Sequence, residues 1–174
     1  YVELRARYYF VEKNKRYFSL LNRVLAERGL NPQIDGRGGC FLGDFVNYCP
    51  RIIDAIKSEG KTHKAIFILD QFGYAAVPML TIQNIFRELP EAEIILTFAA
   101  DWLIDYLTGK KEHIDRCQRR LDELSIGVKV EDLMGIKQSS PHFRLLIQDL
   151  LSEELSRNCG ARYFTRYFIQ TEEK

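Results

Sequence analysis

The sequence lacks the cysteine and histidine spacings that mark metal and redox sites. It has four cysteines and three histidines, and no two cysteines are separated by two residues. No histidine stands at ligand spacing from a cysteine, so neither a zinc site nor a C-x-x-C redox motif is predicted. We therefore predict reduced thiols in a cytoplasmic protein that holds no metal. The cysteines are Cys40, Cys49, Cys117 and Cys159.

An excess of charge and a long apolar run are missing as well. The chain has 25 Lys and Arg against 24 Asp and Glu, a formal net charge of +1. The whole-chain charge therefore does not indicate a nucleic-acid-binding protein, and any basic patch has to be local. No apolar run reaches the length that a membrane span needs, and no signal peptide is visible, so no membrane partner is expected.

Short apolar segments instead alternate with amphipathic ones. Strands are predicted at 8–11, 40–42, 65–69 and 94–98, and a last strand of alternating aromatic and basic residues at 161–169. The runs at 65–69 and 94–98 are continuously apolar, which is typical of parallel strands covered by helices on both faces. This alternation predicts an α/β fold with a doubly wound, mostly parallel sheet and a helical insertion before the last strand.

The helices are predicted from their apolar spacing and their caps. Asn14 and Asp44 are predicted N-caps, with Gly29 and Gly60 ending the two helices. Further helices are predicted near 78–89 and at 101–107, 110–124 and 143–155. The apolar face of the first helix is predicted to consist of Tyr17, Leu20, Leu21, Val24 and Leu25. The glycine-rich stretch 31–39 is predicted to be a loop, and 127–135 has no clear assignment.

Acidic residues follow the predicted strands. Glu12 follows the first strand, Asp44 the second and Asp70 the third, and Asp101 comes shortly after the fourth. Open α/β sheets bind ligands outside the carboxyl ends of their strands, so these residues could line one rim. Each also precedes a helix, where Asp is a favoured N-cap. We interpret Asp101 as a cap, leave capping and binding balanced for Asp44, and favour binding for Glu12 because Asn14 is the better cap.

The neighbours of these carboxylates are suited to a nucleoside. A carboxylate at a strand end, such as Glu12, can accept two hydrogen bonds from a ribose diol. Asp44 could accept a bond from an adenine amino group while Phe45 covers the ring face. Asp70 is followed by Phe72 and then by a glycine that permits a sharp turn, which leaves the aromatic ring at the rim.

The run FILDQFGYAAVP, then a helix, then EIILTFAADWL, resembles the three-Cys-motif partner protein family. Its members look like class I S-adenosylmethionine-dependent methyltransferases with a Rossmann-like fold. The resemblance spans roughly residues 7–108 and more loosely the rest. It implies a single domain over 1–174 that is truncated before its first strand, with a less regular helical and loop insertion over 109–141.

The same resemblance assigns roles to the residues at the strand ends. It implies that Glu12, Asp44 and Phe45 bind S-adenosylmethionine, and that Asp70 and Phe72 take part in catalysis. The substrate is not specified, and nucleic acid is one class that the resemblance suggests. A protein partner encoded alongside the chain is a second implied partner.

Two departures from the family pattern keep an alternative open. Gln71 stands where the family usually has proline, and the glycine cluster 36–39 precedes a strand instead of opening a helix. The cluster is therefore not a cofactor cradle. The alternative is a non-catalytic partner subunit that retains the methyltransferase fold. A nicotinamide-dependent oxidoreductase ranks last, because no catalytic residues of that class are visible.

Two basic segments remain. Residues 110–120 are locally basic, which is usual for a solvated helix face. Arg162, Tyr163, Arg166 and Tyr167 interleave basic and aromatic side chains. Such a pattern could contact nucleic acid by phosphate pairing and stacking, or could be the covered edge of a sheet on which arginine deters association. The second interpretation is favoured from sequence.

Overall fold

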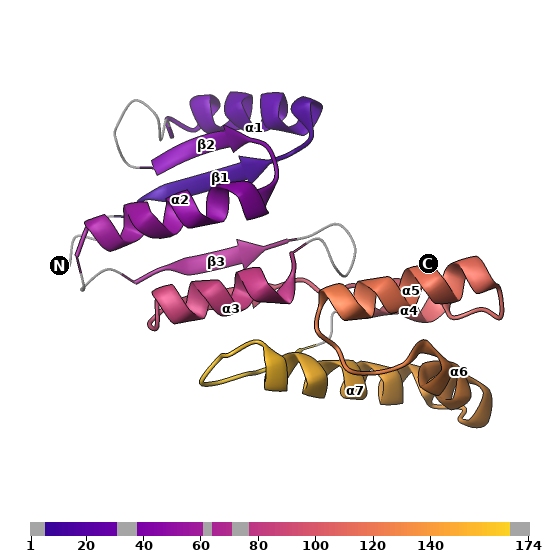
Figure 1. The fold of residues 1–174 in the computed structure, drawn as a ribbon. Helices are drawn as coiled ribbons and strands as arrows, with labels where there is room; N and C mark the ends of the chain where they lie inside the picture. Colours follow the sequence, from indigo (N-terminus) through magenta and orange to yellow (C-terminus); the bar gives the residue numbers. More distant parts are fainter. Residues whose placement is uncertain (1–5, 31–37, 61–63, 71–76, 168–174) are drawn as a thin grey trace. The chain divides into compact units, whose positions relative to one another are not determined.

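The computed structural model describes residues 6–30, 38–60, 64–70 and 77–167. The chain divides into two compact units, Tyr1–His63 and Lys64–Lys174, and each is described by itself. The described residues form seven helices and two parallel sheets of two strands each (Figure 1). The fold is therefore mixed α/β, as predicted, while the described strands do not make up one doubly wound sheet. No helix in the described ranges combines the length and apolarity needed to cross a membrane.

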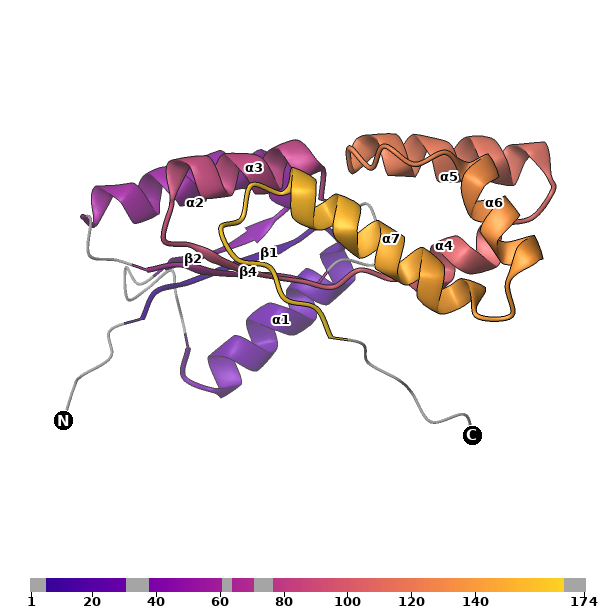
Figure 2. The same cartoon turned by 90° about the horizontal axis from the view of Figure 1, so that it is seen from below.

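The first unit contains one β-α-β-α segment. Its elements are β1 (Tyr8–Glu12), α1 (Lys15–Glu27), β2 (Gly38–Leu42) and α2 (Phe45–Ser58). The two strands are parallel and in register from Tyr8 opposite Gly38 to Glu12 opposite Leu42. Helices α1 and α2 lie on opposite faces of this sheet (Figure 2). The carboxyl ends of both strands therefore lie at the same end of the sheet, and both helices begin there.

The helix caps of this unit confirm the sequence prediction. The side chain of Asn14 accepts hydrogen bonds from the backbone N–H groups of Arg16 and Tyr17, at 2.9 and 3.3 Å. Asp44 Oδ1 accepts from Val46 N–H at 3.0 Å. These bonds satisfy N–H groups that the first turn of a helix leaves without partners. Gly29 and Gly60 follow the helix ends with positive φ, as expected for residues that end a helix.

Strand β2 begins two residues earlier than predicted. Gly38 and Gly39, assigned to a loop from sequence, pair with Tyr8 and Tyr9. The backbones approach so closely that a Cβ on Gly38 would lie 1.7 Å from the carbonyl oxygen of Tyr8, and the φ of Gly38 is 141°. Only glycine fits this position, so the residues that suggested a loop permit the pairing.

Helix α1 turns a different face to the sheet than predicted. Leu25 is buried and Leu21 half-buried, whereas Tyr17 is 58% exposed. Leu20 and Val24 are exposed on the same side as Tyr17. The predicted apolar face was therefore wrong in part: its members span two stripes of the helix, and the stripe that contains Leu21 and Leu25 is the inner one.

The second unit begins with a parallel strand pair joined by a helix. Its elements are β3 (Ile66–Leu69), α3 (Met79–Glu88) and β4 (Glu93–Leu96). The strands are in register from Ile66 opposite Glu93 to Leu69 opposite Leu96. Helix α3 runs along one face of this pair (Figure 2) and buries Met79, Ile82 and Ile85.

One face of this sheet is exposed. Ile66 is 64% exposed and Ile68 71%, and Ile95, which pairs with Ile68, is exposed as well. Phe67 and Leu69 point to the opposite face and are buried. The prediction that helices cover both faces of these strands is therefore wrong for the described residues, because the apolar run continues onto a face that remains open to solvent.

Four helices complete the second unit. They are α4 (Ala100–Tyr106), α5 (Lys111–Glu123), α6 (Val130–Ser139) and α7 (Phe143–Asn158). Helix α7 packs against α4 and α6, and α5 packs against α4 and α6 as well. Their core includes Leu103, Leu121, Leu133 and Ile147, all without exposed surface. Helix α6 occupies part of the stretch that the sequence left unassigned.

The strand predicted at 161–169 does not form over its described part. Residues 161–167 are irregular, and 168 and 169 lie outside the described residues. The segment folds back on α7, where Arg166 forms an ion pair with Asp149 at 2.7 Å. The prediction failed because alternating side chains favour a strand only when a neighbouring strand can pair with them.

The four cysteines are free and buried. Cys49, on α2, is 2% exposed, and burial raises the pKa of its thiol to about 11 from an ordinary value of 9.0. The folded state therefore keeps its proton between pH 9 and 11 while the unfolded chain loses it.

We expect the free energy of unfolding to decrease with pH across this interval. The slope that Cys49 contributes approaches about 1.4 kcal/mol per pH unit. Urea titrations at several pH values should show a flatter decline for Cys49→Ala than for the unmodified protein. Equal slopes would contradict the burial of the thiol.

Candidate functional site

Glu12 and Asp44 lie at the carboxyl end of the β1–β2 sheet, which we call the Glu12–Asp44 edge. Glu12 is the last residue of β1, opposite Leu42 at the end of β2, and Asp44 lies two residues further on. The N–H of Gly43 donates to the carbonyl oxygen of Glu12 at 3.0 Å, which ties the two strand ends together. The parallel pairing thus brings together the two carboxylates that the sequence placed at successive strand ends.

Each of these carboxylates uses one oxygen for local structure. Glu12 Oε1 accepts a 2.6 Å hydrogen bond from Asn14 N–H, and Asp44 Oδ1 accepts from Val46 N–H. Within the described part of the chain, Glu12 Oε2 and Asp44 Oδ2 accept no hydrogen bond. Asp44 therefore caps α2 with one carboxylate oxygen and leaves the other available as an acceptor. Glu12 likewise closes a turn with one oxygen and leaves the other available. Two open carboxylate oxygens at one edge suit a ligand with hydroxyl or amino donors.

The helix starts add a favourable field at this edge. Helices α1 and α2 both begin directly after the strands that end there. The N-terminus of a helix carries a partial positive charge, which stabilises carboxylates nearby. Phe45 opens α2 beside Asp44 and is half-buried. The candidate cofactor residues Glu12, Asp44 and Phe45 are thus all placed at one edge.

Tyr48 belongs to this edge and was missed from sequence. Its hydroxyl donates to the carbonyl oxygen of Leu42 at 3.1 Å, and its ring stacks on Phe41 with centroids 4.9 Å apart. A Cβ on Gly43 would lie 2.7 Å from the Tyr48 ring. The sequence spacing could have indicated Tyr48, because it follows Asp44 by one helical turn and therefore lies on the same side of α2.

We expect Gly43→Ala to lower the free energy of unfolding by about 1–3 kcal/mol. The φ of Gly43 is 153°, and the new methyl group would collide with the Tyr48 ring. Gly60→Ala is the matched control, because Gly60 has a φ of 109° but no atom within 4 Å of its Cβ position. Urea unfolding should show the larger loss for Gly43→Ala. If the two variants lost the same amount, the ring would not occupy the place described.

Asp70 lies at the end of β3 in the second unit. Its side chain is exposed and makes no hydrogen bond or ion pair among the described residues. The N–H of Thr97 donates to the carbonyl oxygen of Leu69, so the ends of β3 and β4 stay paired next to Asp70. Phe72, its predicted catalytic neighbour, lies outside the described residues, as does Gln71.

Asp101 has a structural role other than the predicted one. The N-cap position of α4 is Ala99, and Asp101 lies in the first turn. Its carboxylate accepts a 2.9 Å bond from Arg144 of α7, and the same guanidinium donates to Asp105 at 2.7 Å. The hydrogen bond to Asp105 raises the pKa of Arg144. Asp101 therefore links α4 to α7, and the interpretation as a cap was wrong.

We expect Arg144→Gln to lower the free energy of unfolding by at most about 1 kcal/mol, because the pairs are exposed and screened. The loss should shrink as salt is added, which urea titrations at low and high salt would show. A loss that did not depend on salt would contradict an electrostatic link. Asp101→Asn and Asp105→Asn, measured one at a time, show how much each carboxylate contributes to the free energy of unfolding.

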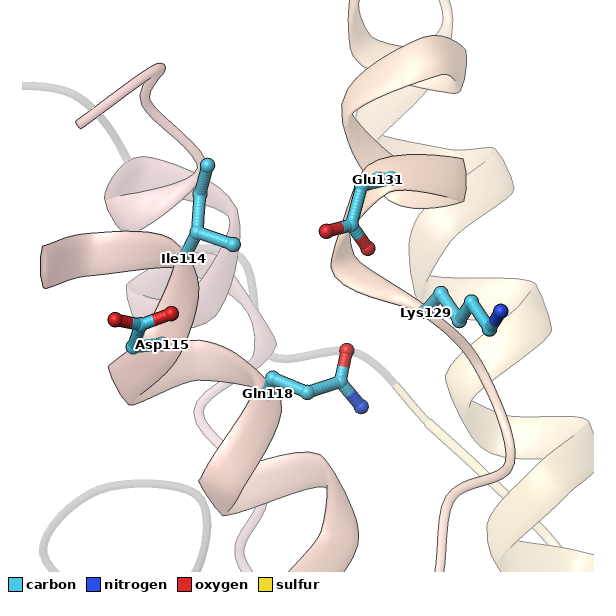
Figure 3. Close-up of a pocket in the computed structure, with 5 residues that line it drawn as sticks. All are labelled: Ile114, Asp115, Gln118, Lys129 and Glu131. Carbon is cyan, nitrogen blue, oxygen red and sulfur yellow. The ribbon is translucent and has the colours of Figure 1, made fainter. Parts of the chain in front are cut away.

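A hollow of about 560 Å³ lies between α5 and the start of α6 (Figure 3). It is lined by Ile114, Asp115, Gln118, Lys129 and Glu131. Gln118 is fully engaged there, because its carbonyl accepts from Val130 N–H at 2.9 Å and its amide donates to Asp122 at 2.9 Å. The bond from Val130 N–H ties the start of α6 to α5, and we assign the hollow a structural origin.

No protein-family model, curated protein or solved structure matches the chain. The described residues contain no group of three or more His, Cys, Asp or Glu side chains arranged to hold a metal ion. The assignment of function therefore rests on the geometry of the Glu12–Asp44 edge and on the sequence resemblance.

Proposed function

We propose that the protein is an S-adenosylmethionine-dependent methyltransferase that holds the nucleoside of its cofactor at the Glu12–Asp44 edge. The observation that carries the proposal is the pair of open carboxylate oxygens at the ends of two paired parallel strands. Ligands of open α/β sheets bind at such carboxyl ends. The donors of a nucleoside, a ribose diol and an amino group, match these acceptors in chemistry.

Each residue at the edge has a distinct part in the proposal. Glu12 accepts from the ribose hydroxyls through Oε2, while its bond to Asn14 N–H fixes the orientation of the carboxylate. Asp44 accepts from the adenine amino group and remains anchored by Val46 N–H. Phe45 covers the face of the base. The bound cofactor would supply an electrophilic methyl group, which a correctly placed nucleophile attacks in line.

Asp70 orients the substrate in this proposal, supported by its open carboxylate and by the sequence resemblance. It accepts a hydrogen bond from a substrate amine or hydroxyl and does not need to take up a proton. Phe72 is assigned to the same role by the resemblance alone. We expect Asp70→Ala, which removes the acceptor, to lower methyl transfer about tenfold or more, because a misplaced nucleophile reacts slowly.

The test is transfer of tritiated methyl from S-adenosylmethionine to candidate acceptors, with nucleic acid as the first class. The affinity for S-adenosylhomocysteine, measured on the same Asp70→Ala preparation, should not change. Unchanged transfer in this variant would remove Asp70 from the mechanism.

A non-catalytic partner subunit is the second candidate function. The exposed face formed by Ile66, Ile68 and Ile95 favours it, because an apolar sheet face of this kind is typical of a surface that another protein covers. In that case the full-length protein would form a stable complex with a catalytic subunit and would bind no cofactor. Light scattering on the complex, together with cofactor titration, distinguishes the two functions.

A further inference from the structure

The segment Ala161–Tyr167, which follows α7, presents aromatic rings to solvent. Tyr163 is 87% exposed and Tyr167 71%, and Phe164 is exposed between them. A covered sheet edge would have buried these rings, and the described part of the segment contains no strand. Three exposed aromatic rings within one short segment are more typical of a binding surface than of a sheet edge.

Arginines alternate with the rings. Arg166 is held by Asp149 of α7 at 2.7 Å. Arg162 is exposed and forms no ion pair or hydrogen bond with any described residue. Its guanidinium is therefore open to an anion, and a planar group with several donors suits a phosphate in particular.

The segment is anchored near its end, and the helix that precedes it is fixed at its last residue. The amide of Gln83 donates to the carbonyl oxygen of Asn158 at 2.7 Å, and the side chain of Asn158, the last residue of α7, donates to the carbonyl oxygen of Ser125 at 2.7 Å. Near its end, Arg166 is paired with Asp149. A surface that is partly fixed before binding loses less conformational freedom when a ligand arrives.

We propose that this segment is a contact surface for single-stranded nucleic acid. Bases stack on the rings of Tyr163 and Tyr167, and Arg162 pairs with a phosphate between or beside them. Single strands fit better than a duplex, because paired bases hide their faces in the helical stack. An apolar protein partner is disfavoured because the two arginines interrupt the rings. The surface belongs to the second unit and does not require a bound cofactor.

The test is fluorescence anisotropy with labelled single-stranded DNA and RNA, each about 12 nucleotides long, and a duplex of the same length. We expect single strands to bind more tightly than the duplex, with affinity falling as salt rises. Tyr163→Ala and Tyr167→Ala should each weaken binding about tenfold. Arg162→Gln should lower the slope of log affinity against log salt by about one. Tyr17→Ala removes an exposed ring from α1 and is the matched control.

Each outcome of these titrations either supports or contradicts the proposed nucleic-acid surface. Loss of binding in the two tyrosine variants with retention in Tyr17→Ala supports the proposal. Failure of the unmodified protein to bind any single strand overturns it, and so does equal binding by all variants. Loss of self-association in the tyrosine variants, without an effect on nucleic acid, would assign the surface to protein contacts. Because the replaced side chains are exposed, circular dichroism should show unchanged folding. Glu12 has a role in the proposed cofactor site only. Repeating the nucleic-acid titration with Glu12→Gln, without cofactor, therefore tests this proposal independently of the methyltransferase proposal.

Discussion

Glu12→Gln is expected to weaken binding of S-adenosylhomocysteine about tenfold to a hundredfold. Glutamine keeps an oxygen that can accept from Asn14 N–H, so the turn after β1 is preserved. The open carboxylate oxygen, however, becomes an amino group that donates, and it then faces ribose hydroxyls that also have to donate. Hydrogen bonds to a charged acceptor contribute about 1.5–3 kcal/mol, which sets the size of the effect.

Asp44→Ser extends this prediction to the neighbouring strand end. Serine is as good an N-cap as aspartate, so α2 is retained while the open Oδ2 and the charge are lost. Calorimetric titration should show a loss similar to that of Glu12→Gln. Asp54→Asn is the control, because Asp54 is an exposed acid on α2 away from the strand ends. A loss of affinity in Asp54→Asn as large as in the other two would show a general charge effect and contradict the assigned edge.

The second large effect concerns the two faces of β3. We expect Phe67→Ala to lower the free energy of unfolding by about 3–5 kcal/mol, because it opens a cavity under the sheet. Ile68→Ala, one residue later, should change it by no more than about 0.5 kcal/mol, as is usual for an exposed side chain. The contrast follows from the burial of Phe67 and the 71% exposure of Ile68.

Urea unfolding of the two variants measures this contrast. If Ile68→Ala were as destabilising as Phe67→Ala, the outer face would be covered in solution, as the apolar run predicts. Ile66→Ala, on the same face as Ile68, repeats the test at the other end of the strand.

The sequence predicted well the features that depend on neighbouring residues. The caps at Asn14 and Asp44, the bounds of α1 and α2 and the start of α7 follow from local hydrogen bonding and helical periodicity. The neighbouring positions of Glu12 and Asp44 also followed, because parallel strands end at the same edge.

Features that depend on distant parts of the chain could not be predicted. The pairing of Gly38 with Tyr8 and the missing strand at 161–167 are decided by which backbone is close enough to pair. The open face at Ile68 depends on whether a helix reaches it, which periodicity does not reveal. Tyr48, by contrast, was missed although its spacing from Asp44 places both residues on one side of α2.

The most direct test of the central claim is calorimetric titration of S-adenosylhomocysteine into the full-length protein. We expect micromolar binding by the unmodified protein and its loss in both Glu12→Gln and Asp44→Ser. A folded protein that releases no heat and shows no binding by a second method would contradict the cofactor site, and it would leave the partner-subunit function as the better account.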